Sequence, residues 1–269
     1  MNKVIISLAP VSAADTRVIP EEVAAEVVQA EKLGAAMVHL HVRDKTGKLT
    51  PDVTDFAETI GLIRKGSNLV IQASSGGISA MNMEQRCAPL FKCPIVEMTS
   101  LNGGSTNLGD AVYANSLPDI LYCATVATER DIVPEYEVFE IGMINSICEL
   151  DAQIKVSKPM LINTVFGHRG TMPATIDALV HFRHFVPKDA LWGVTHFGRR
   201  SFDFLAAAIG MGADLVRIGF EDSKFIDAEQ RAENNLQLVE KLATLIRAMD
   251  REIATPDEAR RILNVKPKP

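Results

Sequence analysis

The sequence has few cysteines, no long apolar run and no excess of positive charge. Its four cysteines, Cys87, Cys93, Cys123 and Cys148, include no pair with the C-x-x-C spacing of a zinc knuckle or a redox motif. No apolar run approaches the roughly 20 residues that a membrane-spanning helix needs. The opening segment MNKVIISLAP has too short an apolar run for a signal peptide. We therefore expect a cytoplasmic globular protein with reduced, mostly buried thiols.

The charge balance argues against nucleic-acid binding. The formal net charge is -6, whereas a nucleic-acid footprint requires a clustered basic surface. No low-complexity tract or charge block indicates disorder. At 269 residues, with 47% hydrophobic and 23% charged residues, the chain is typical of a compact domain and has a suitable length for one barrel.

Short apolar runs rich in β-branched residues alternate with longer amphipathic segments along the whole chain. Such short runs are typical of strands that are covered on both faces, as in parallel sheets. The predicted strands are residues 4–10, 37–43, 69–75, 95–101, 132–139, 160–167, 191–198 and 215–222.

The segments between these strands have helical patterns. One helix is predicted to begin at Pro20, followed by two acidic residues, and to end at Gly34. A last helix is predicted over 254–264, capped by Thr255 with Pro256 at its first position. Between these two, helices are predicted over 54–66, 83–91, 119–131, 143–153, 175–185, 201–212 and 233–250, the last of which could be divided.

Eight strands that are each followed by a helix predict one (β/α)8 TIM-barrel domain over 1–269, with an extra C-terminal helix. The alternative is an open doubly wound sheet. That fold would place a phosphate-binding glycine fingerprint after the first strand, and the segment APVSAADT has none.

Two histidines lie on the second predicted strand, in the segment HLHVRD of residues 39–44. Side chains of a strand alternate between its two faces, so His39 and His41 point to the same side. Two imidazoles placed in this way can bind one divalent metal ion. An isolated H-x-H is weak evidence, because two histidines can equally well satisfy hydrogen bonds in a core.

The eighth predicted strand, LVRIGFED, carries charged residues where barrels usually pack branched apolar side chains. Arg217 and Glu221 share one parity, and burying them is costly unless they are paired or bound to a metal. In a closed barrel the eighth strand lies next to the first, and the second lies just beyond. Glu221 could therefore join the two histidines. The alternative is an ion pair with Arg217 that only helps to close the barrel.

Small and polar residues also gather at the ends of other predicted strands, where the active sites of such barrels are built. The sequence places there Ser74, Ser75, Gly76, Gly77, Thr99, Ser100, Glu135 and Glu137. The glycines permit close approach of the backbone to a ligand, but glycines equally well form turns. Together the set indicates a polar site more strongly than any one member does.

Several of these segments make the chain resemble a known family. VHLHVRD and VRIGFED form a specific pair at this separation, and SSGG, SLNGGSTNLGD, VPEYEVFEIGM, the FGR of THFGRR and ATPDEAR extend the match almost end to end. The chain resembles the β-keto acid cleavage enzyme family, one member of which cleaves 3-keto-5-aminohexanoate. The resemblance implies a (β/α)8 barrel, commonly a homotetramer, with zinc as the usual metal. It also implies that a β-keto acid and acetyl-CoA give acetoacetate and a new acyl-CoA by a retro-Claisen route.

Carried over position by position, the resemblance implies a role for each matching residue. His39, His41 and Glu221 would be the zinc ligands, and Arg217 and Asp222 the catalytic pair. Glu137, Ser74, Ser100, Gly76 and Gly77 would lie at the substrate site. We expect Asp222 to take a proton from the methyl group of acetyl-CoA while Arg217 positions it. Because a neighbouring arginine lowers the pKa of an aspartate, burial or substrate binding must offset that effect.

Three departures from the family pattern concern the substrate. The aminohexanoate enzyme has a glutamate that receives the substrate amine, and this chain has Ala14 there, next to Asp15. His168 and Arg169 stand in a stretch that is glycine-rich in the relatives, and His196 replaces a small residue. We expect a neutral, hydroxylated or anionic substituent on the substrate and not a primary amine. The alternatives are that Asp15 replaces the glutamate, or that these residues face solvent or another subunit.

Two other functions are compatible with the same residues. One is a zinc-dependent aldolase or hydrolase that does not use CoA. The other is a metal- or ligand-binding barrel without turnover, which is disfavoured because Arg217, Asp222 and Ser74 are all present.

Overall fold

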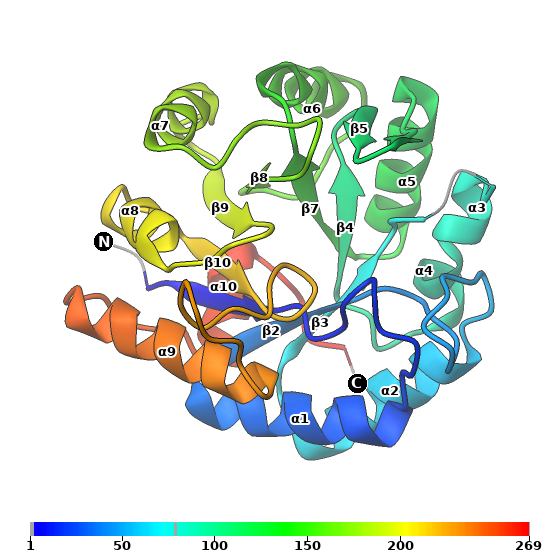
Figure 1. The fold of residues 1–269 in the computed structure, drawn as a ribbon. Coiled ribbons are helices and arrows are strands. Elements are labelled where there is room, and N and C mark those ends of the chain that lie inside the picture. Colours follow the sequence, from blue (N-terminus) through cyan, green and yellow to red (C-terminus); the bar gives the residue numbers. More distant parts are fainter. Residues whose placement is uncertain (1–2, 78–79, 269) are drawn as a thin grey trace.

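A closed barrel of eight parallel strands forms the centre of the computed structural model, which describes residues 3–77 and 80–268 (Figure 1). The order around the barrel is β1-β10-β9-β8-β7-β4-β3-β2, so consecutive barrel strands are neighbours. The open doubly wound sheet is thereby excluded, and each of the eight predicted strands is confirmed. Their bounds are Ile5–Leu8 (β1), Ala35–Leu40 (β2), Val70–Ser74 (β3), Met98–Asn102 (β4), Val133–Val138 (β7), Leu161–Phe166 (β8), Leu191–His196 (β9) and Leu215–Ile218 (β10).

Helices surround the barrel on its outer side (Figure 1). The first begins at Pro20 as predicted, and Gly34 ends it with a left-handed φ of 117°. Within the described residues, no helix is long and apolar enough to cross a membrane. The outer helices are α1 (Pro20–Leu33), α2 (Thr54–Gly66), α5 (Leu117–Glu129), α6 (Ile141–Gln153), α7 (Ile176–Phe185), α8 (Asp203–Gly210) and α9 (Asn235–Ala248).

The predicted helix over 83–91 is wrong in one respect. It is two short helices, α3 (Met83–Arg86) and α4 (Ala88–Lys92), which meet at Cys87. Pro89 explains the division, because a proline has no N–H to donate and its ring clashes with the carbonyl four residues earlier.

The interior of the barrel is layered. Near the amino ends, each strand contributes one apolar side chain, and these are Ile5, Met37, Val70, Met98, Val133, Leu161, Leu191 and Leu215. Two residues further along, the inward positions are Ser7, His39, Gln72, Ser100, Glu135, Asn163, Gly193 and Arg217, all buried. The change from apolar to polar side chains indicates that the active site lies at the carboxyl end of the barrel, where barrels of this kind have their catalytic residues.

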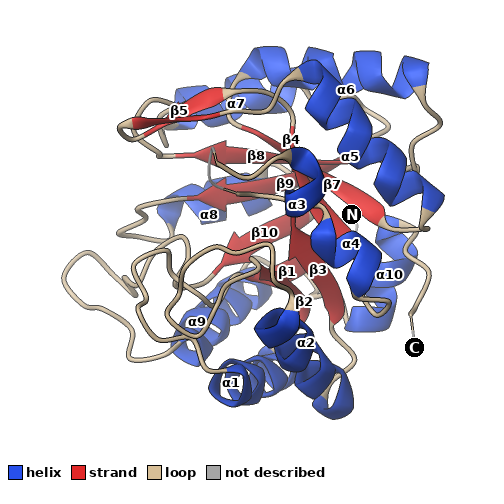
Figure 2. Ribbon diagram, turned by 90° about the vertical axis from the view of Figure 1, so that its right-hand side faces the viewer, coloured by secondary structure: helices blue, strands red, loops and turns tan. Residues whose placement is uncertain are grey.

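The C-terminal helix α10 (Pro256–Leu263) closes the opposite, amino-terminal end of the barrel (Figure 2). Its Ala259 and Leu263 pack into the apolar layer. Thr255 caps the helix as predicted, in a reciprocal capping box with Glu258. Arg260 reaches the fully buried Glu97 through Nε at 2.7 Å and Nη2 at 3.0 Å.

A small antiparallel hairpin at the carboxyl end of the barrel was not predicted. Its strands are β5 (Thr106–Leu108) and β6 (Ala111–Tyr113), with Gly109 and Asp110 between them. The Gly-Asp pair is a hairpin signal, but strands of three residues are too short to show a periodicity. Figure 2 shows the hairpin at the end of the barrel that α10 does not cover.

The ion pairs of Glu97 are expected to be important for stability. Arg64 Nη2 also donates to this carboxylate, at 2.6 Å. Glu97→Ala should lower the free energy of unfolding by about 3–5 kcal/mol, because it leaves two arginines without their buried partner. Urea unfolding followed by circular dichroism measures this loss. As a control, Glu22→Ala in the exposed pair with Arg17 should leave the curve almost unchanged. Equal losses in the two variants would contradict the prediction.

Candidate active site

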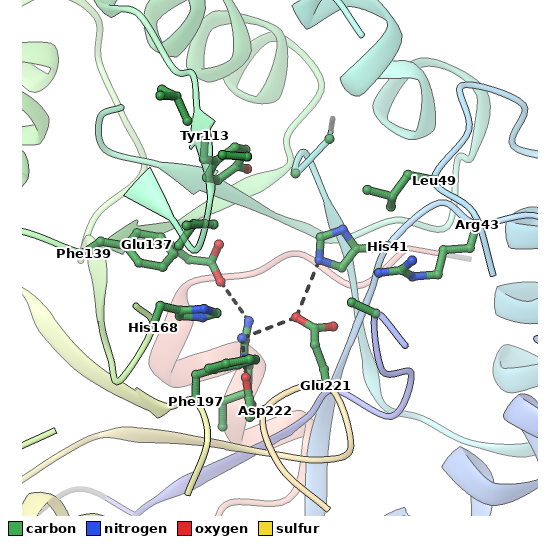
Figure 3. A pocket seen from close by; sticks show the side chains of 17 residues that line it. His41, Arg43, Leu49, Tyr113, Glu137, Phe139, His168, Phe197, Glu221 and Asp222 are labelled. Carbon is green, nitrogen blue, oxygen red and sulfur yellow. Dashed lines mark hydrogen bonds and ion pairs between the residues drawn. The ribbon is translucent and has the colours of Figure 1, made fainter. Parts of the chain in front are cut away.

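A pocket of about 390 Å³ lies at the carboxyl ends of the strands (Figure 3). Two kinds of side chain line it. One group is charged or able to ligate a metal: His41, Arg43, Glu137, His168, Arg217, Glu221 and Asp222. The other is mainly apolar and comes largely from the loops: Leu49, Leu108, Val112, Tyr113, Phe139 and Phe197. A pocket of this kind, with a few converging polar groups, is typical of a small-molecule site.

His39, His41 and Glu221 come together in this pocket as a set that could hold a metal ion. Their potential ligand atoms all lie within 4.8 Å of one another. Nε2 of His39 and Nε2 of His41 are each 3.5 Å from Oε1 of Glu221. Tetrahedral zinc with bonds of about 2.0–2.1 Å requires ligand atoms roughly 3.3 Å apart. The spacing therefore fits a single zinc ion with room for further ligands on the pocket side.

Glu221 reaches the histidines through a turn and not through strand parity. Strand β10 ends at Ile218, and Gly219 follows with a φ of 146°. A Cβ on Gly219 would stand 2.1 Å from the carbonyl oxygen of Ala9, so only glycine fits there. The N–H of Glu221 then donates to that same carbonyl at 3.1 Å. Glu221 therefore lies beyond the strand, and its expected placement by the alternation of strand side chains is wrong. Its expected closeness to His39 and His41 is nevertheless present.

A buried hydrogen-bond chain fixes the His39 ring. Its Nδ1 lies 2.6 Å from Oε1 of Gln72, whose Nε2 donates to Glu135 at 2.8 Å. Asn163 donates to the other oxygen of Glu135. Because the Gln72 oxygen can only accept, Nδ1 of His39 carries the proton and Nε2 has a free lone pair. That Nε2 is buried and has no hydrogen-bond partner in the described part of the chain, as expected of a metal ligand.

Electrostatics also favour a neutral His39 ring. Burial, together with the charge of Arg217, lowers the pKa of His39 to about 3, although Glu221 opposes this shift. A metal ligand must present such a neutral imidazole. Gln72 was not recognised from the sequence. A lone polar residue at an inward position of an otherwise apolar strand was the signal that could have found it.

Arg217 is the buried cation of the site. Its Nη2 and Nε donate to Asp222 at 2.6 and 3.1 Å, and its Nη1 donates to Glu137 at 2.8 Å. Glu221 lies 3.4 Å from the same guanidinium. Three carboxylates therefore share one arginine, an arrangement found where proton transfer or charge stabilisation is required.

Burial shifts the pKa values of two of these acids. It raises the pKa of Asp222 even though Arg217 opposes it, so the expected offset of the arginine's effect is present. Burial likewise raises the pKa of Glu137 to about 8, against the attraction of Arg217. A carboxylate with a raised pKa is a stronger base than an exposed one.

The serine-glycine segment at the end of β3 forms part of the pocket wall. Gly76 and Gly77 line the pocket, and a Cβ on Gly76 would stand 2.7 Å from Cε1 of His41. Ser74 and Ser100 lie buried beneath them, with their hydroxyl oxygens 3.1 Å apart. Oγ of Ser74 accepts the N–H of Gly76 at 3.0 Å. The two serines thus support the glycine loop, and neither belongs to the pocket lining.

The residues that depart from the family pattern have different positions. Ala14 is exposed, and Asp15 pairs with Lys224 at 2.9 Å. Arg169 is largely exposed and pairs with Asp110.

The two histidines among these departures also differ from each other. His196 packs against Phe204 of α8, with ring centroids 4.8 Å apart, and is absent from the pocket lining. His168 does line the pocket.

Removal of the Gln72 amide is expected to weaken metal binding. Gln72→Leu deletes the acceptor that orients His39, and loss of such an outer partner typically lowers metal affinity about 10–100-fold. Competition with a zinc-binding dye measures the affinity. Thr99→Val, at a buried hydroxyl that donates to the backbone carbonyl of Ser100, is the control and should bind metal as the wild type does. Unchanged affinity in Gln72→Leu would show that the ring is not held in this way.

Comparison with known proteins agrees with the motifs. A family model described as beta-keto acid cleavage enzyme matches residues 3–265. The 3-keto-5-aminohexanoate cleavage enzyme of Fusobacterium nucleatum subsp. nucleatum is 38% identical over 99% of this chain and 99% of its own. The 3,5-dioxohexanoate:acetyl-CoA acetone transferase of Paraburkholderia graminis is 29% identical over 98% and 96%.

Among solved structures, the apo structure of ObcA has a TM-score of 0.76 at 16% identity. The match covers 92% of this chain and 65% of the ObcA chain, and at this identity it concerns the fold alone. The fold and the family resemblance expected from the sequence are both confirmed. The chain belongs to the β-keto acid cleavage enzyme family.

Proposed function

We propose that this protein cleaves a β-keto acid with acetyl-CoA, giving acetoacetate and a new acyl-CoA, and that Zn²⁺ is held by His39, His41 and Glu221. The observation that carries the proposal is the pairing of two features in one pocket. One is a triad of ligand atoms that leaves metal positions open. The other is the buried Arg217–Asp222 pair next to it. The names of the two curated relatives support the same reaction class.

The donor set fits a catalytic zinc ion. Two histidines and one glutamate are three protein ligands, and a catalytic zinc site keeps its remaining position for water or substrate. When bound, zinc supplies a Lewis acid for the keto oxygen of the substrate. The protein's own part is to hold the neutral ring of His39 through Gln72 and to keep the pocket wall close through Gly76.

Asp222 is the base in this proposal. Its raised pKa makes it a better proton acceptor than an exposed aspartate. Arg217 holds both carboxylate oxygens of Asp222, which fixes their direction, and balances the negative charge that moves through the site. Glu137 occupies the other side of the guanidinium and limits its movement.

The products decide which carbon loses its proton. Acetoacetate must contain C1 and C2 of the keto acid joined to the acetyl group. Asp222 therefore takes a proton from C2 of the keto acid, and C2 attacks the thioester carbonyl and displaces CoA thiolate. The thiolate then attacks the original keto carbon, and the bond from that carbon to C2 breaks. Asp222 returns the proton to C2, so atoms and charge balance. Attack by the acetyl-CoA methyl on the ketone, our expectation from the sequence, would give a branched hydroxy acid.

Several finer expectations stay predictions. They are assembly as a homotetramer, a cytoplasmic location, organisation as one domain, and contact of Ser74 and Ser100 with substrate. A zinc-dependent aldolase or hydrolase without CoA is the second candidate function. It differs in one measurable respect, since its turnover would not require acetyl-CoA.

Acetoacetate formation tests the proposal directly. The zinc-loaded protein is incubated with a panel of β-keto acids, with and without acetyl-CoA, and acetoacetate is measured with a coupled dehydrogenase. We expect acetoacetate and a new thioester only when acetyl-CoA is present. Chelation should abolish turnover and zinc should restore it. Keto-acid cleavage without acetyl-CoA would favour the second candidate function instead.

Two variants separate metal binding from proton transfer. Asp222→Asn should keep zinc and lower kcat by about 10²–10⁴-fold, the range for loss of a general base. Glu221→Gln should lose both zinc and activity. Metal analysis of the purified proteins and steady-state kinetics provide the two readouts. Near-wild-type turnover of zinc-loaded Asp222→Asn would refute the role of this residue.

A further inference from the structure

His168 lies in an aromatic slot on the pocket wall. Its ring stacks on Phe197, with centroids 3.8 Å apart and an angle of 14° between the planes. Phe139 approaches from another direction, with centroids 5.7 Å apart and a tilt of 58°. Figure 3 shows the His168 ring between Glu137 and Phe197, pointing into the pocket. The slot therefore presents the edge of the imidazole to whatever occupies the pocket.

The ring nitrogens of His168 are available for a ligand. Neither has a hydrogen-bond partner among residues 3–77 and 80–268. Burial, with a contribution from the charge of Arg217, lowers the pKa of His168 to about 4. At neutral pH the ring is therefore uncharged and offers one N–H donor and one acceptor nitrogen. Water can pair with these nitrogens in the half-buried ring's surroundings, so a ligand that displaces the water must replace its hydrogen bonds.

A tight loop holds the ring in this position before any ligand binds. Gly167 has a φ of 93°, and a Cβ there would stand 2.4 Å from the carbonyl oxygen of Phe197. Its N–H donates to the carbonyl of Met172 at 3.0 Å, and the N–H of Thr171 donates to the carbonyl of His168 at 3.2 Å. A donor fixed in advance binds its ligand at a lower entropic cost.

The charged side chains of the pocket limit what can bind beside His168. Each of the three carboxylates, Glu137, Glu221 and Asp222, faces Arg217 within 3.4 Å. Arg43 also lines the pocket. In the zinc-loaded protein the two arginines and the metal ion would outweigh the three carboxylates, so an ammonium group on a substrate would meet no surplus of negative charge. The surroundings of His168 are otherwise aromatic or aliphatic, from Phe139 and Phe197 to the hairpin. An uncharged oxygen is the group that matches a neutral donor in such a wall.

We propose that His168 is a substrate-binding residue that donates a hydrogen bond to an uncharged oxygen, and that the pocket selects substrates without a positively charged substituent. The inference depends on the proposed function, because that function defines the two substrates. The oxygen belongs either to the substituent of the β-keto acid or to a carbonyl of acetyl-CoA. Both have the same chemistry, and kinetics separate them.

The experiment uses the zinc-loaded protein and three β-keto acids of the same length: 3-ketohexanoate and its 5-hydroxy and 5-amino derivatives. His168→Phe keeps the stack and removes the donor. If the keto acid supplies the oxygen, its KM should rise about tenfold for the hydroxy compound, the size of one lost hydrogen bond. The KM for 3-ketohexanoate should then change less than twofold. If acetyl-CoA supplies the oxygen, its KM should rise about tenfold with every keto acid. In both cases kcat should stay within threefold.

Two further variants control for structural effects. His168→Asn retains an amide donor and should recover part of the lost affinity. His181→Phe makes the same change on the exposed face of α7, where Nδ1 of His181 lies 2.7 Å from the carbonyl oxygen of Asp177, and should leave all KM values as in the wild type. The proposal is overturned if His168→Phe changes neither KM, if it lowers kcat equally with all substrates at constant KM, or if Asn recovers nothing. It is also overturned if the wild type prefers the amino compound.

Calorimetric titration tests substrate binding by His168 separately from the proposed reaction. Acetyl-CoA and each keto acid can be titrated separately into wild-type and His168→Phe protein, without any turnover. If the wild type forms no acetoacetate, the proposed function fails. A weaker heat signal in His168→Phe would still support His168 as a binding residue, and identical titrations would refute it.

Discussion

The site depends on how one buried guanidinium is shared. Arg217 holds Asp222 with two hydrogen bonds, holds Glu137 with a third, and lies 3.4 Å from Glu221. Three acids around one arginine leave an excess of negative charge in a region that excludes water, and such an excess is costly. Burial first, and the neighbouring acids second, raise the pKa values of Glu137 and Asp222. A divalent cation on the neighbouring triad would offset the remaining charge, so metal binding there would also change the pKa values of these acids.

The barrel interior has an apolar layer that stabilises the fold and a polar layer that positions the site. Eight apolar side chains, one from each strand, close the amino end, and α10 covers them while its Arg260 pairs with Glu97. One step along the strands the interior becomes polar. There a chain of hydrogen bonds runs from His39 through Gln72 to Glu135 and Asn163. Because each member has its partners, the polar layer can be buried at moderate cost and still hold one ring in one orientation.

The loops contribute a separate wall of the pocket. The β5–β6 hairpin and the loop after β8 are joined by the N–H of Gly109, which donates to the carbonyl of Arg169 at 2.9 Å, and by the Arg169–Asp110 ion pair. Together they bring Leu108, Val112 and His168 to one wall. The candidate metal ligands and the Arg217–Asp222 pair thus lie on strands β2 and β10 or directly after them, whereas longer loops supply the opposite wall of the pocket. This division is usual in barrels, where loop variation changes the substrate and leaves the strands intact.

The sequence by itself determined the eight strands, most helix boundaries and the common side of His39 and His41. Periodicity and capping residues are local properties that a single chain can show. Tertiary structure decided the rest. Three contacts join positions that are far apart in the sequence or outside regular strands. They are the turn at Gly219 that brings Glu221 to the histidines, the pairing of Gln72 with His39, and the hydrogen bond between Ser74 and Ser100. Among the residues that depart from the family pattern, His168 lines the pocket and His196 does not. Barrel closure and loop packing decide these two positions. Such contacts depend on register and loop conformation, and no local pattern encodes them.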